Sequence, residues 1–354
     1  MERIARGGIL VGLALASSTS AIGPHLTMSG LSGELAGGAE RPTAHLRLPS
    51  AAPARRVRVP GLPGNAASLP AACVHSVPNG ATVDATTNSV LLNGSIIAQY
   101  APCSGQMAST GPTAAVPSTS GYSEYWYQNF ASQLSSGDHI DYLTSSWTVP
   151  PGPTGSIGDL VFLWDGVLSS DSTVLIQPVL QWGDTCQWTE IGQSNPACDN
   201  GNNNGQQWIL ASWYVNLYQG AFYSAPVGAS ANDQIYGTSW LTNQVNGYQT
   251  WSVVAYDSNT GQSSYFNIYY STVDWTQGYP GVLEWLSGSS CNQLPNSSGI
   301  EFSSITAAHG YPNYTALSLG WQPFAPNNYC DFSQANVVGD LLLLWSTSAT
   351  CSGC

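Results

Sequence analysis

Short runs of apolar and aromatic residues recur along most of the chain, separated by clusters of Gly, Pro, Asn, Asp and Ser. The runs are rich in β-branched and aromatic residues, and such runs bounded by turn residues are typical of β-strands. Their spacing predicts an all-β chain that folds as an antiparallel β-sandwich. The clearest runs lie at 141–150, 159–167, 173–183, 207–218, 233–241, 249–258, 264–271, 281–288, 299–305 and 341–346.

Two of these runs carry polar side chains inside an apolar pattern. In STVLIQPVLQWGD (172–184), Gln177 and Gln181 fall on one face of the predicted strand, which indicates the floor of a polar groove. Without a partner for Gln177, the simpler interpretation is that both amides lie on the wet face of a sheet. The proline after Gln177 removes a backbone donor, so this strand lies at an edge, is bulged or is locally irregular.

The second run, GYPGVLEWLSG (278–288), places Glu284 inside an apolar strand, with Val282 and Leu286 on its own face and Leu283 and Trp285 on the other. A buried Glu is costly unless it is paired, hydrogen-bonded or protonated. All seven cationic residues are arginines at or before Arg58, so none remains to pair with Glu284 once the N-terminal segment is removed. Partial burial and the lack of cations both raise the pKa of a carboxyl group, toward what a general acid or base needs in acid conditions. The alternative is a Glu exposed on the solvent face of its strand.

The charge distribution limits the partners of the protein. Charged residues make up 8% of the chain, and 17 of its 20 acidic residues follow Arg58, because only Glu2, Glu34 and Glu40 precede it. An acidic surface repels nucleic acid and anionic membranes, so we expect neither as a partner. The chain also has few salt bridges to lose when its carboxylates are protonated, which suits acidic surroundings. Simple solubility through negative charge is the alternative.

The N-terminus predicts export. Residues 1–22 combine two arginines, an apolar stretch and small residues, as a signal peptide does, and the stretch is too short to span a membrane. Residues 23–70 predict a disordered, basic, low-complexity leader, which is either a pro-segment lying on the acidic body until cleavage or a plain secretion leader. Residues 71–118 predict a small β extension with an Asn-Gly hairpin turn in SVLLNGSIIAQY. Residues 119–354 predict the sandwich domain.

Eight cysteines, an even number in an exported chain, indicate disulfides rather than metal ligands or a redox thiol. We therefore expect a secreted, extracellular protein. Proximity along the chain suggests four pairs, although sequence alone does not fix the connectivity: Cys73 with Cys103, Cys186 with Cys198, Cys291 with Cys330, and Cys351 with Cys354.

Several common catalytic signatures are missing from the sequence. It contains neither H-E-x-x-H nor G-x-S-x-G and no glycine-rich phosphate loop, and we expect no metal and no cofactor. The Asp-Thr pair at 184–185 is followed by Cys186 rather than Gly, which argues against a pepsin-like dyad. After the leader the only histidines are His75, His139 and His309, and we expect each in a loop or at the surface rather than as a general base.

Taken together, the two polar runs resemble the glutamic peptidases, or eqolisins, a family of secreted acid proteases with a concanavalin A-like (jelly-roll) β-sandwich. The family's catalytic Gln lies in a segment of the form I-L-Q-T-G-x-x-W, which LIQPVLQW (175–182) matches at Gln177 and Trp182. The family's catalytic Glu follows two aliphatic residues, as Glu284 does in GVLEWL.

The resemblance extends over about residues 120–310. TSSWTVPPGPTG, FLWDG, ASWYV, VGASANDQIYGTS and GIEFSSI follow other landmarks of the family in the same order. The chain departs from the family pattern at Pro178, at Asn232 and at the two residues after Glu284, and no tryptophan near Val161 clearly matches one in the family's cleft.

The resemblance implies an acid endopeptidase of the pepstatin-insensitive class that acts on polypeptides. We also expect a monomer, in which the basic leader could be an intramolecular pro-segment. Glu284 would act as the general base on a water molecule, and Gln177 would orient this water and donate a hydrogen bond to the developing oxyanion. Activity would peak in acid and fail well above neutrality. The aromatic candidates for cleft walls could equally be packed in the core. The substrate-binding candidates are Trp182, Trp213, Tyr214, Gln181 and Asp165.

Two other functions stay open at this point. Thirteen tryptophans on a lectin-like sandwich could stack sugars, and a glycosidase needs two carboxylates, for which Glu284 and Glu301 are the best pair. The third reading is a binding or cell-surface module in which the Gln–Glu pair is a relic.

Overall fold

A computed structural model of the chain describes residues 56–61, 68–103, 123–124, 138–155, 160–183, 206–286, 290–321, 329–337 and 339–349. The chain divides into two units, Met1–Ala51 and Ala52–Cys354, and all of these residues belong to the second unit. The predicted signal peptide, most of the leader and the predicted disulfides Cys186–Cys198 and Cys351–Cys354 lie outside the described residues.

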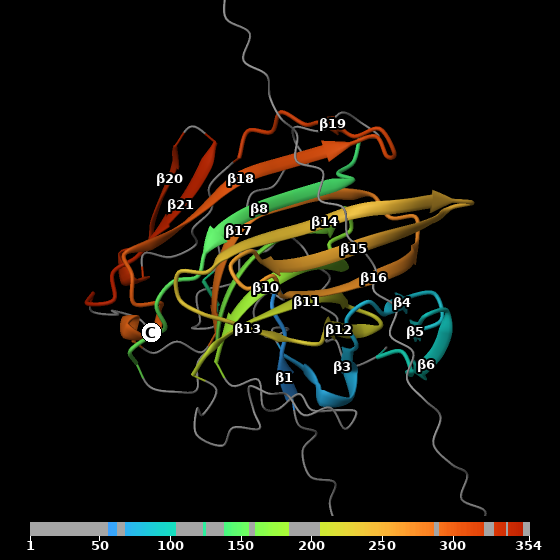
Figure 1. The fold of residues 1–354 in the computed structure, drawn as a ribbon, viewed down its shortest axis with the longest axis horizontal. Helices are drawn as coiled ribbons and strands as arrows, with labels where there is room; N and C mark the ends of the chain where they lie inside the picture. The colour runs from blue at the N-terminus through green and yellow to red at the C-terminus, as the bar shows by residue number, and fades with distance from the viewer. Residues whose placement is uncertain are drawn as a thin grey trace, which may run out of the picture. The chain divides into compact units, whose positions relative to one another are not determined.

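The described residues form two large β-sheets (Figure 1). The first, the eight-stranded sheet, has the order β3-β12-β11-β10-β9-β17-β7, and β13 also pairs with β11. Its strands are β3 (Val74–Val77), β7 (Ser123–Glu124), β9 (Leu160–Ser169), β10 (Val174–Trp182), β11 (Trp208–Asn216), β12 (Gly220–Ser224), β13 (Val227–Ala229) and β17 (Trp275–Leu286).

The second, the eleven-stranded sheet, has the order β20-β21-β18-β8-β14-β15-β16-β4-β5-β6, with β19 paired to β18. Its strands are β4 (Thr82–Asp84), β5 (Ser89–Leu92), β6 (Ser95–Gln99), β8 (Tyr142–Thr148), β14 (Gln234–Val245), β15 (Tyr248–Asp257), β16 (Ser263–Ser271), β18 (Gly299–His309), β19 (Thr315–Ala316), β20 (Ser333–Val337) and β21 (Asp340–Leu344). The remaining described elements are the strand pair β1 (Arg56–Arg58) and β2 (Ser68–Pro70) and the short 3₁₀ helices η2 (Ala71–Cys73), η4 (Cys291–Gln293) and η5 (Tyr329–Asp331).

The predicted all-β sandwich is confirmed, and each of the ten apolar runs overlaps a strand. Most neighbouring strands are antiparallel, as predicted. The exceptions are β3 beside β12 and β4 beside β16, which are parallel pairs. A short stretch of chain therefore extends both sheets, since β3 joins the eight-stranded sheet and β4 joins the eleven-stranded one. In the described part of the chain, no helix is long and apolar enough to span a membrane.

Alternation along the strands sends side chains of the eight-stranded sheet to two different clusters. Ile176 of β10 packs with residues of both sheets, and Leu180 does the same, so these side chains belong to the core between the sheets. Leu175 and Val179 instead join a cluster on the opposite face. We call this opposite face the leader face, because Val59 and Leu69 of the predicted leader belong to the same cluster. The other members of the leader-face cluster include Phe162, Trp164, Ala211, Trp213, Val215, Tyr223, Tyr279 and Val282.

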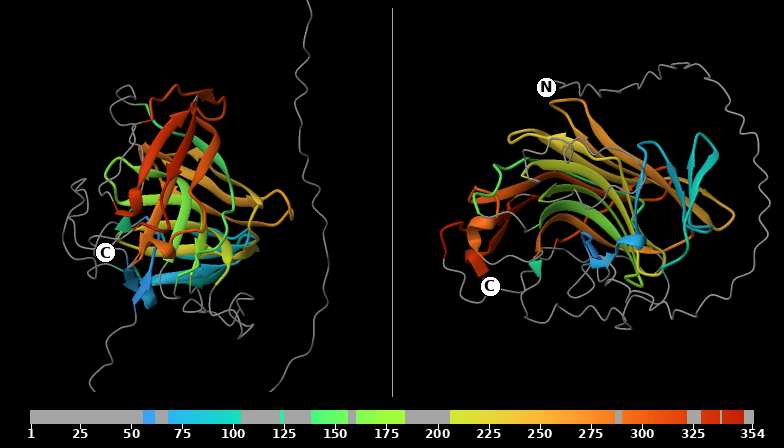
Figure 2. Two further views of the ribbon diagram at one scale, coloured as in Figure 1. Left: turned by 90° about the vertical axis from the view of Figure 1, so that its left-hand side faces the viewer. Right: turned by 90° about the horizontal axis from the view of Figure 1, so that it is seen from below.

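The predicted leader has more structure than its composition suggested. Its described residues form the strand pair β1–β2, which lies on the inner side of the arch made by the eight-stranded sheet (Figure 2, right). Val59 is 0% exposed and Leu69 is 1% exposed, so this part of the chain contributes to a hydrophobic cluster. Burial of these two side chains stabilises the strand pair, which the low-complexity composition of the leader alone does not predict.

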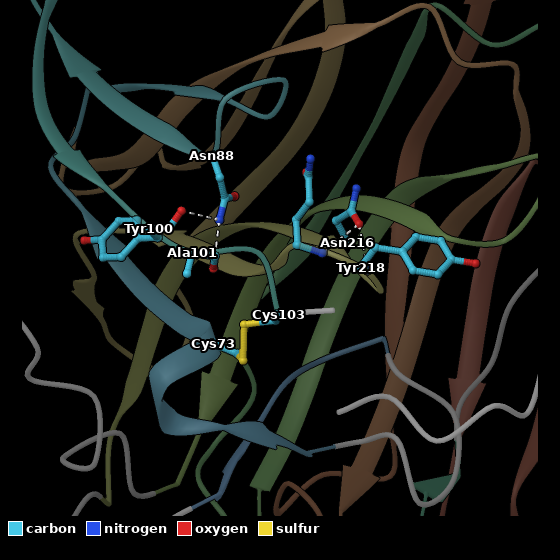
Figure 3. Close-up of a disulfide and its surroundings, with 8 residues drawn as sticks. Cys73, Asn88, Tyr100, Ala101, Cys103, Asn216 and Tyr218 are labelled. Carbon is cyan, nitrogen blue, oxygen red and sulfur yellow. Dashed lines mark hydrogen bonds between the residues drawn. A yellow bond between two sulfur atoms is a disulfide. The ribbon is translucent and has the colours of Figure 1, made fainter. Parts of the chain in front are cut away.

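The Asn-Gly hairpin is confirmed. Strands β5 and β6 pair across Asn93 and Gly94, whose φ angles of 51° and 78° are the left-handed values that such a tight turn requires. The same region is closed by the disulfide between Cys73 and Cys103, one of two predicted pairs that the structure contains (Figure 3). Beside it, the Asn88 side chain donates hydrogen bonds to the carbonyl oxygens of two residues that precede Cys103, Tyr100 and Ala101.

The second confirmed disulfide, Cys291–Cys330, links η4 to η5 inside the core beside the eleven-stranded sheet. Replacing both cysteines by Ser should lower the free energy of unfolding by about 4 kcal/mol, because the crosslink closes a 39-residue loop in the unfolded chain. Urea unfolding of the variant and the native chain, both without reductant, measures this difference. A loss well below about 2 kcal/mol would contradict it.

Candidate active site

The central strands β9, β10 and β17 bring Gln177 and Glu284 together on the leader face. Trp164 of β9 pairs with Val179 of β10 on one side and with Val282 of β17 on the other. Gln177 and Glu284 each lie two residues from these partners, so alternation points both side chains to the same face as Trp164. The predicted strand face of Glu284 is therefore confirmed, since Val282 belongs to the leader-face cluster and Leu283 to the core between the sheets.

Both side chains contact one peptide bond, the bond between Pro60 and Gly61. The Gln177 side-chain amide donates a hydrogen bond from Nε2 to the Pro60 carbonyl oxygen at 2.8 Å. The Gly61 backbone N–H donates to Oε2 of Glu284 at 2.6 Å. Trp164 donates from Nε1 to the same carboxyl oxygen at 3.3 Å. A carboxyl group, a neutral amide and an indole N–H thus converge on one backbone unit.

Burial sets the protonation of Glu284. Its side chain is only 1% exposed, and desolvation raises its pKa to about 8, although the hydrogen bonds from Gly61 and Trp164 favour the ionised form. The predicted direction is therefore confirmed, with burial as the cause. The leader contributes to this burial, because Gly61 contacts the carboxyl group directly. An exposed Glu284, the alternative reading of the sequence, is excluded by the same observation.

Gln177 is 0% exposed, so it does not lie on a wet sheet face as the simpler reading of the sequence expected. Its carbonyl oxygen, Oε1, accepts no hydrogen bond among the described residues. Gly166 of β9 leaves room for the Gln177 side chain, since a Cβ at Gly166 would lie 2.9 Å from the Gln177 Cβ and 2.5 Å from the carbonyl oxygen of Ile176. The buried Oε1 is an acceptor suited to a water molecule.

The sheet is irregular at the level of the site. β10 lies between β9 and β11, so the edge position that Pro178 suggested is wrong, whereas the local irregularity is confirmed. Pairing of β10 with β9 is interrupted between Ile176 and Val179, because Pro178 has no N–H to donate. Across β9, the pairing with β17 shifts register between Tyr279 and Val282. The backbone thus departs from a regular ladder on both sides of β9 beside the Gln–Glu pair.

Asp165 does not belong to the site, because it points to the other face of β9. A Cβ added at Gly237 of β14 would lie 2.1 Å from its Oδ1, which places the carboxyl group between the two sheets. Burial raises its pKa well above the usual range, although contacts with Ser145 favour the ionised form. The substrate-binding role expected of Asp165 is therefore not supported by its position.

The other predicted wall residues divide between the two faces. Trp213 pairs with Gln177 across the strands, lies on the leader face and stacks on Tyr223 with ring centroids 4.9 Å apart. Gln181 is 0% exposed, and its amide atoms have no hydrogen-bond partner among the described residues. Tyr214 and Trp182 pack with the clusters between the sheets, so their predicted role as cleft walls does not fit their position. Tyr214 follows Trp213 in β11, and because side chains alternate along a strand it points to the opposite face.

Two contributors to the site were missed by the sequence analysis. Trp164 lies in the segment FLWDG, but alternation within that strand could not show that it shares a face with Gln177, because this depends on how β9 and β10 pair. The contact of Pro60 and Gly61 with the site could not be predicted from the sequence, because the residues around them show no pattern that indicates which part of the chain they contact.

The histidines take no part in these contacts. His75, expected at the surface, is buried against Tyr100 with ring centroids 3.6 Å apart, and burial lowers its pKa to about 4, so it is neutral above that pH. His139 and His309 are partly exposed, as expected, beside Asp141 and Asp138 respectively. In the described ranges, no cluster of three His, Cys, Asp or Glu residues is suited to hold a metal ion.

Comparison with known proteins gives a distant similarity of fold. No protein-family model and no curated protein matches the sequence. A crystal structure of scytalido-glutamic peptidase with a peptide-based transition-state analogue is 12% identical, covers 64% of this chain and 98% of its own, and has a TM-score of 0.36. A structure of SCP-B, described as a member of the eqolisin family of peptidases in a complex with the tripeptide Ala-Ile-His, is 13% identical, with the same coverage and TM-score.

The position of Gln177 depends on Gly166. Replacing Gly166 by Ala should destabilise the protein by about 1–3 kcal/mol, because the new methyl group would overlap the backbone of β10 and crowd Gln177. Gly228→Ala is the matched control in the same sheet, since a Cβ there meets nothing within 4 Å. Chemical unfolding of both variants measures the effect, and equal stability of the two would contradict the packing described here.

The raised pKa of Glu284 predicts a stability that falls as pH rises. Because the folded-state pKa is about 8 and the ordinary value is 4.5, the folded state favours the protonated form. The contribution of Glu284 to the free energy of unfolding is therefore greatest below about pH 4.5, and the protein loses a few kcal/mol of stability as the pH rises to about 8. Glu284→Gln should flatten this decline, whereas Glu301→Gln, at an exposed position, should leave it unchanged. Thermal unfolding between pH 4 and 8 measures it, and an unaltered slope in Glu284→Gln would count against a buried, neutral Glu284.

Proposed function

We propose that the protein is an acid endopeptidase that uses Glu284 and Gln177 to hydrolyse peptide bonds. One observation carries the proposal: a single peptide bond has its carbonyl oxygen at the Gln177 amide and its nitrogen at the Glu284 carboxyl group. These are the two atoms that change charge or take up a proton when a peptide bond is hydrolysed, and each faces a group of suitable chemistry.

In the proposed reaction, ionised Glu284 removes a proton from a water molecule that attacks the carbonyl carbon. Gln177 donates a hydrogen bond from Nε2 to the oxyanion that forms, and its Oε1, which has no partner among the described residues, accepts one from the attacking water. Glu284 then returns the proton to the nitrogen of the leaving amine. Trp164 holds the carboxyl group in place through Nε1. A neutral amide suits acid conditions, because it keeps its donor at any acid pH.

The pH range follows from two buried carboxyl groups. Glu284 must lose its proton to act as a base, and in the covered site burial holds its pKa at about 8. When Gly61 leaves, water reaches the carboxyl group, and its pKa falls toward the ordinary acid range. Activity at high pH is then limited by the fold, because ionisation of buried Asp165, whose pKa is raised well above its usual value, destabilises the sandwich.

The glycosidase alternative finds less support. Glu301, the proposed second carboxylate, lies on β18 in the eleven-stranded sheet and is exposed, whereas Glu284 is buried on the leader face of the other sheet. The two carboxyl groups therefore do not flank a common site, as glycoside hydrolysis requires.

An export signal would place the peptidase outside the cell, and the two disulfides are compatible with that location.

Hydrolysis of a denatured protein such as casein at about pH 2–6, around the ordinary carboxyl pKa values, tests the proposal. At least one of two chains should be active: the full chain, or its Gly61→Ala variant, in which the added methyl group prevents the leader from occupying the site. Introducing Glu284→Ala or Gln177→Ala into the active form should each lower the rate by about 100-fold or more. Activity is followed as new amino groups released over time.

Glu301→Gln and Gln262→Ala are matched controls at exposed positions and should retain full activity. The proposal fails if neither the full chain nor Gly61→Ala hydrolyses protein anywhere in this range. It also fails if the Glu284→Ala variant keeps the activity.

A further inference from the structure

The leader segment Val59–Pro60–Gly61 occupies the Gln–Glu site as an extended peptide would. Val59 is 0% exposed and packs in the leader-face cluster with Trp164, Trp213 and Val282 among others. Pro60 is buried as well, and its carbonyl oxygen is the one that Gln177 binds. An apolar residue and a proline thus lie on the carbonyl side of the bond that spans the site.

The residue on the nitrogen side has no room for a side chain. A Cβ at Gly61 would lie 2.1 Å from Cδ2 of Leu175 and 3.1 Å from both amide atoms of Gln177. Gly61 also has a φ of 78°, in the left-handed region that favours glycine. Leu175 and Gln177 therefore restrict this position to glycine, because any larger residue displaces either the peptide or the amide that should bind its carbonyl oxygen.

We propose that the Pro60–Gly61 bond is the protein's own first substrate, and that the site prefers bonds between proline and glycine that follow an apolar residue. This inference rests on the proposed function and specifies its substrate. It follows from the chain's own peptide, whose carbonyl oxygen and nitrogen already face the two proposed catalytic side chains.

The reaction consumes one water molecule and needs no other reactant. Water adds to the Pro60 carbonyl carbon, and its proton passes to Glu284. The bond between this carbon and the Gly61 nitrogen then breaks, and Glu284 returns the proton to that nitrogen. The products are a fragment that ends in a Pro60 carboxyl group and a chain that begins with a Gly61 amino group.

The charge distribution favours departure of the fragment in acid. All seven arginines of the chain precede Pro60, so cleavage leaves a body with 17 acidic residues (20 minus Glu2, Glu34 and Glu40) and no lysine or arginine. This body attracts the basic fragment near neutral pH. As its carboxylates are protonated the attraction weakens, and the fragment leaves a site that had been closed to other peptides.

The sequence contains an internal control for the register of cleavage. VPGLPG, residues 59–64, holds a second proline–glycine bond between Pro63 and Gly64, also preceded by an apolar residue. Of the two bonds, the structure describes Pro60–Gly61 in the site. In the intact chain we therefore expect cleavage before Gly61, whereas a free peptide of this sequence should be cut at both bonds.

The test is to incubate the full chain at pH values from about 4 to about 8, between the ordinary pKa of a Glu side chain and the raised pKa of the covered Glu284, and to identify the new N-terminus by sequencing and mass spectrometry. Cleavage should become faster toward pH 8, because Glu284 in the covered site must be ionised to act as the base. We expect a chain that begins at Gly61, formed at a rate independent of protein concentration, as an intramolecular reaction requires. Glu284→Gln should stay uncut. Gly61→Ala should be cut at least 10-fold more slowly, because of the contact with Leu175.

Two further variants separate the fit at Gly61 from general damage. Gly94→Ala has the same φ of 78° but meets nothing within 4 Å, so it should be cut like the native chain. Leu175→Ala should restore cleavage to the Gly61→Ala chain by making room for the methyl group. Thermal unfolding of each variant checks that it is folded, and the acid-treated native chain should hydrolyse a Val-Pro-Gly peptide at least 10-fold faster than its Val-Pro-Ala counterpart.

The outcomes distinguish this inference from the proposed function. If the native chain stays uncut while Gly61→Ala digests casein, the segment is an inhibitor and not a substrate, so the inference fails and the function stands. Cleavage at Pro63–Gly64 in the intact chain, or equal rates for the two peptides, overturns the register or the preference for glycine. If no variant hydrolyses any protein, both are wrong.

Discussion

No lysine or arginine follows Arg58, so the buried carboxyl groups of the sandwich depend on protonation and on hydrogen bonds from histidine, from neutral side chains and from the backbone. Asp141 shows one solution: burial raises its pKa, but hydrogen bonds from His139 and from the backbone N–H groups of Gly310 and Tyr311 outweigh it, and the net pKa is lowered. Asp165 and Glu284 show the other, because burial outweighs their few donors and both favour the protonated form. Because both groups are protonated in acid, this constraint makes the fold more stable there than at neutral pH.

The same strands that bury these groups also position them. β9 presents Trp164 to the leader face and Asp165 to the core between the sheets, so two neighbouring residues support opposite sides of the eight-stranded sheet. Pro178 interrupts the ladder between β10 and β9 directly after Gln177. Such interruptions cost hydrogen bonds in the centre of a sheet, and they lie where the Gln–Glu pair must approach a peptide backbone.

Several features could be predicted from the sequence because they depend on neighbours along the chain. Turn residues and apolar runs defined the strands, the Asn93–Gly94 pair defined a hairpin, and the alternation around Glu284 gave its correct face. The resemblance to the glutamic peptidases singled out Gln177 among the amides for the proposed site. In contrast, Pro178 suggested an edge strand, yet β10 is central, because the hydrogen bonds that proline cannot make are missing on only one side of the strand.

The sequence by itself determined the period of the strands, the absence of cations after Arg58 and the polar residues at Gln177 and Glu284. Only the tertiary structure decided which layer covers each face. The alternation of side chains along a strand shows which residues share a face, but it does not show what packs against that face. Tyr214 therefore belongs to the core, and Pro60–Gly61 of a basic leader lies between an amide and a carboxyl group more than a hundred residues away along the chain. Contacts of that separation depend on how the sheets stack and on which apolar side chains, here Val59 and Leu69, can be buried between distant parts of the chain.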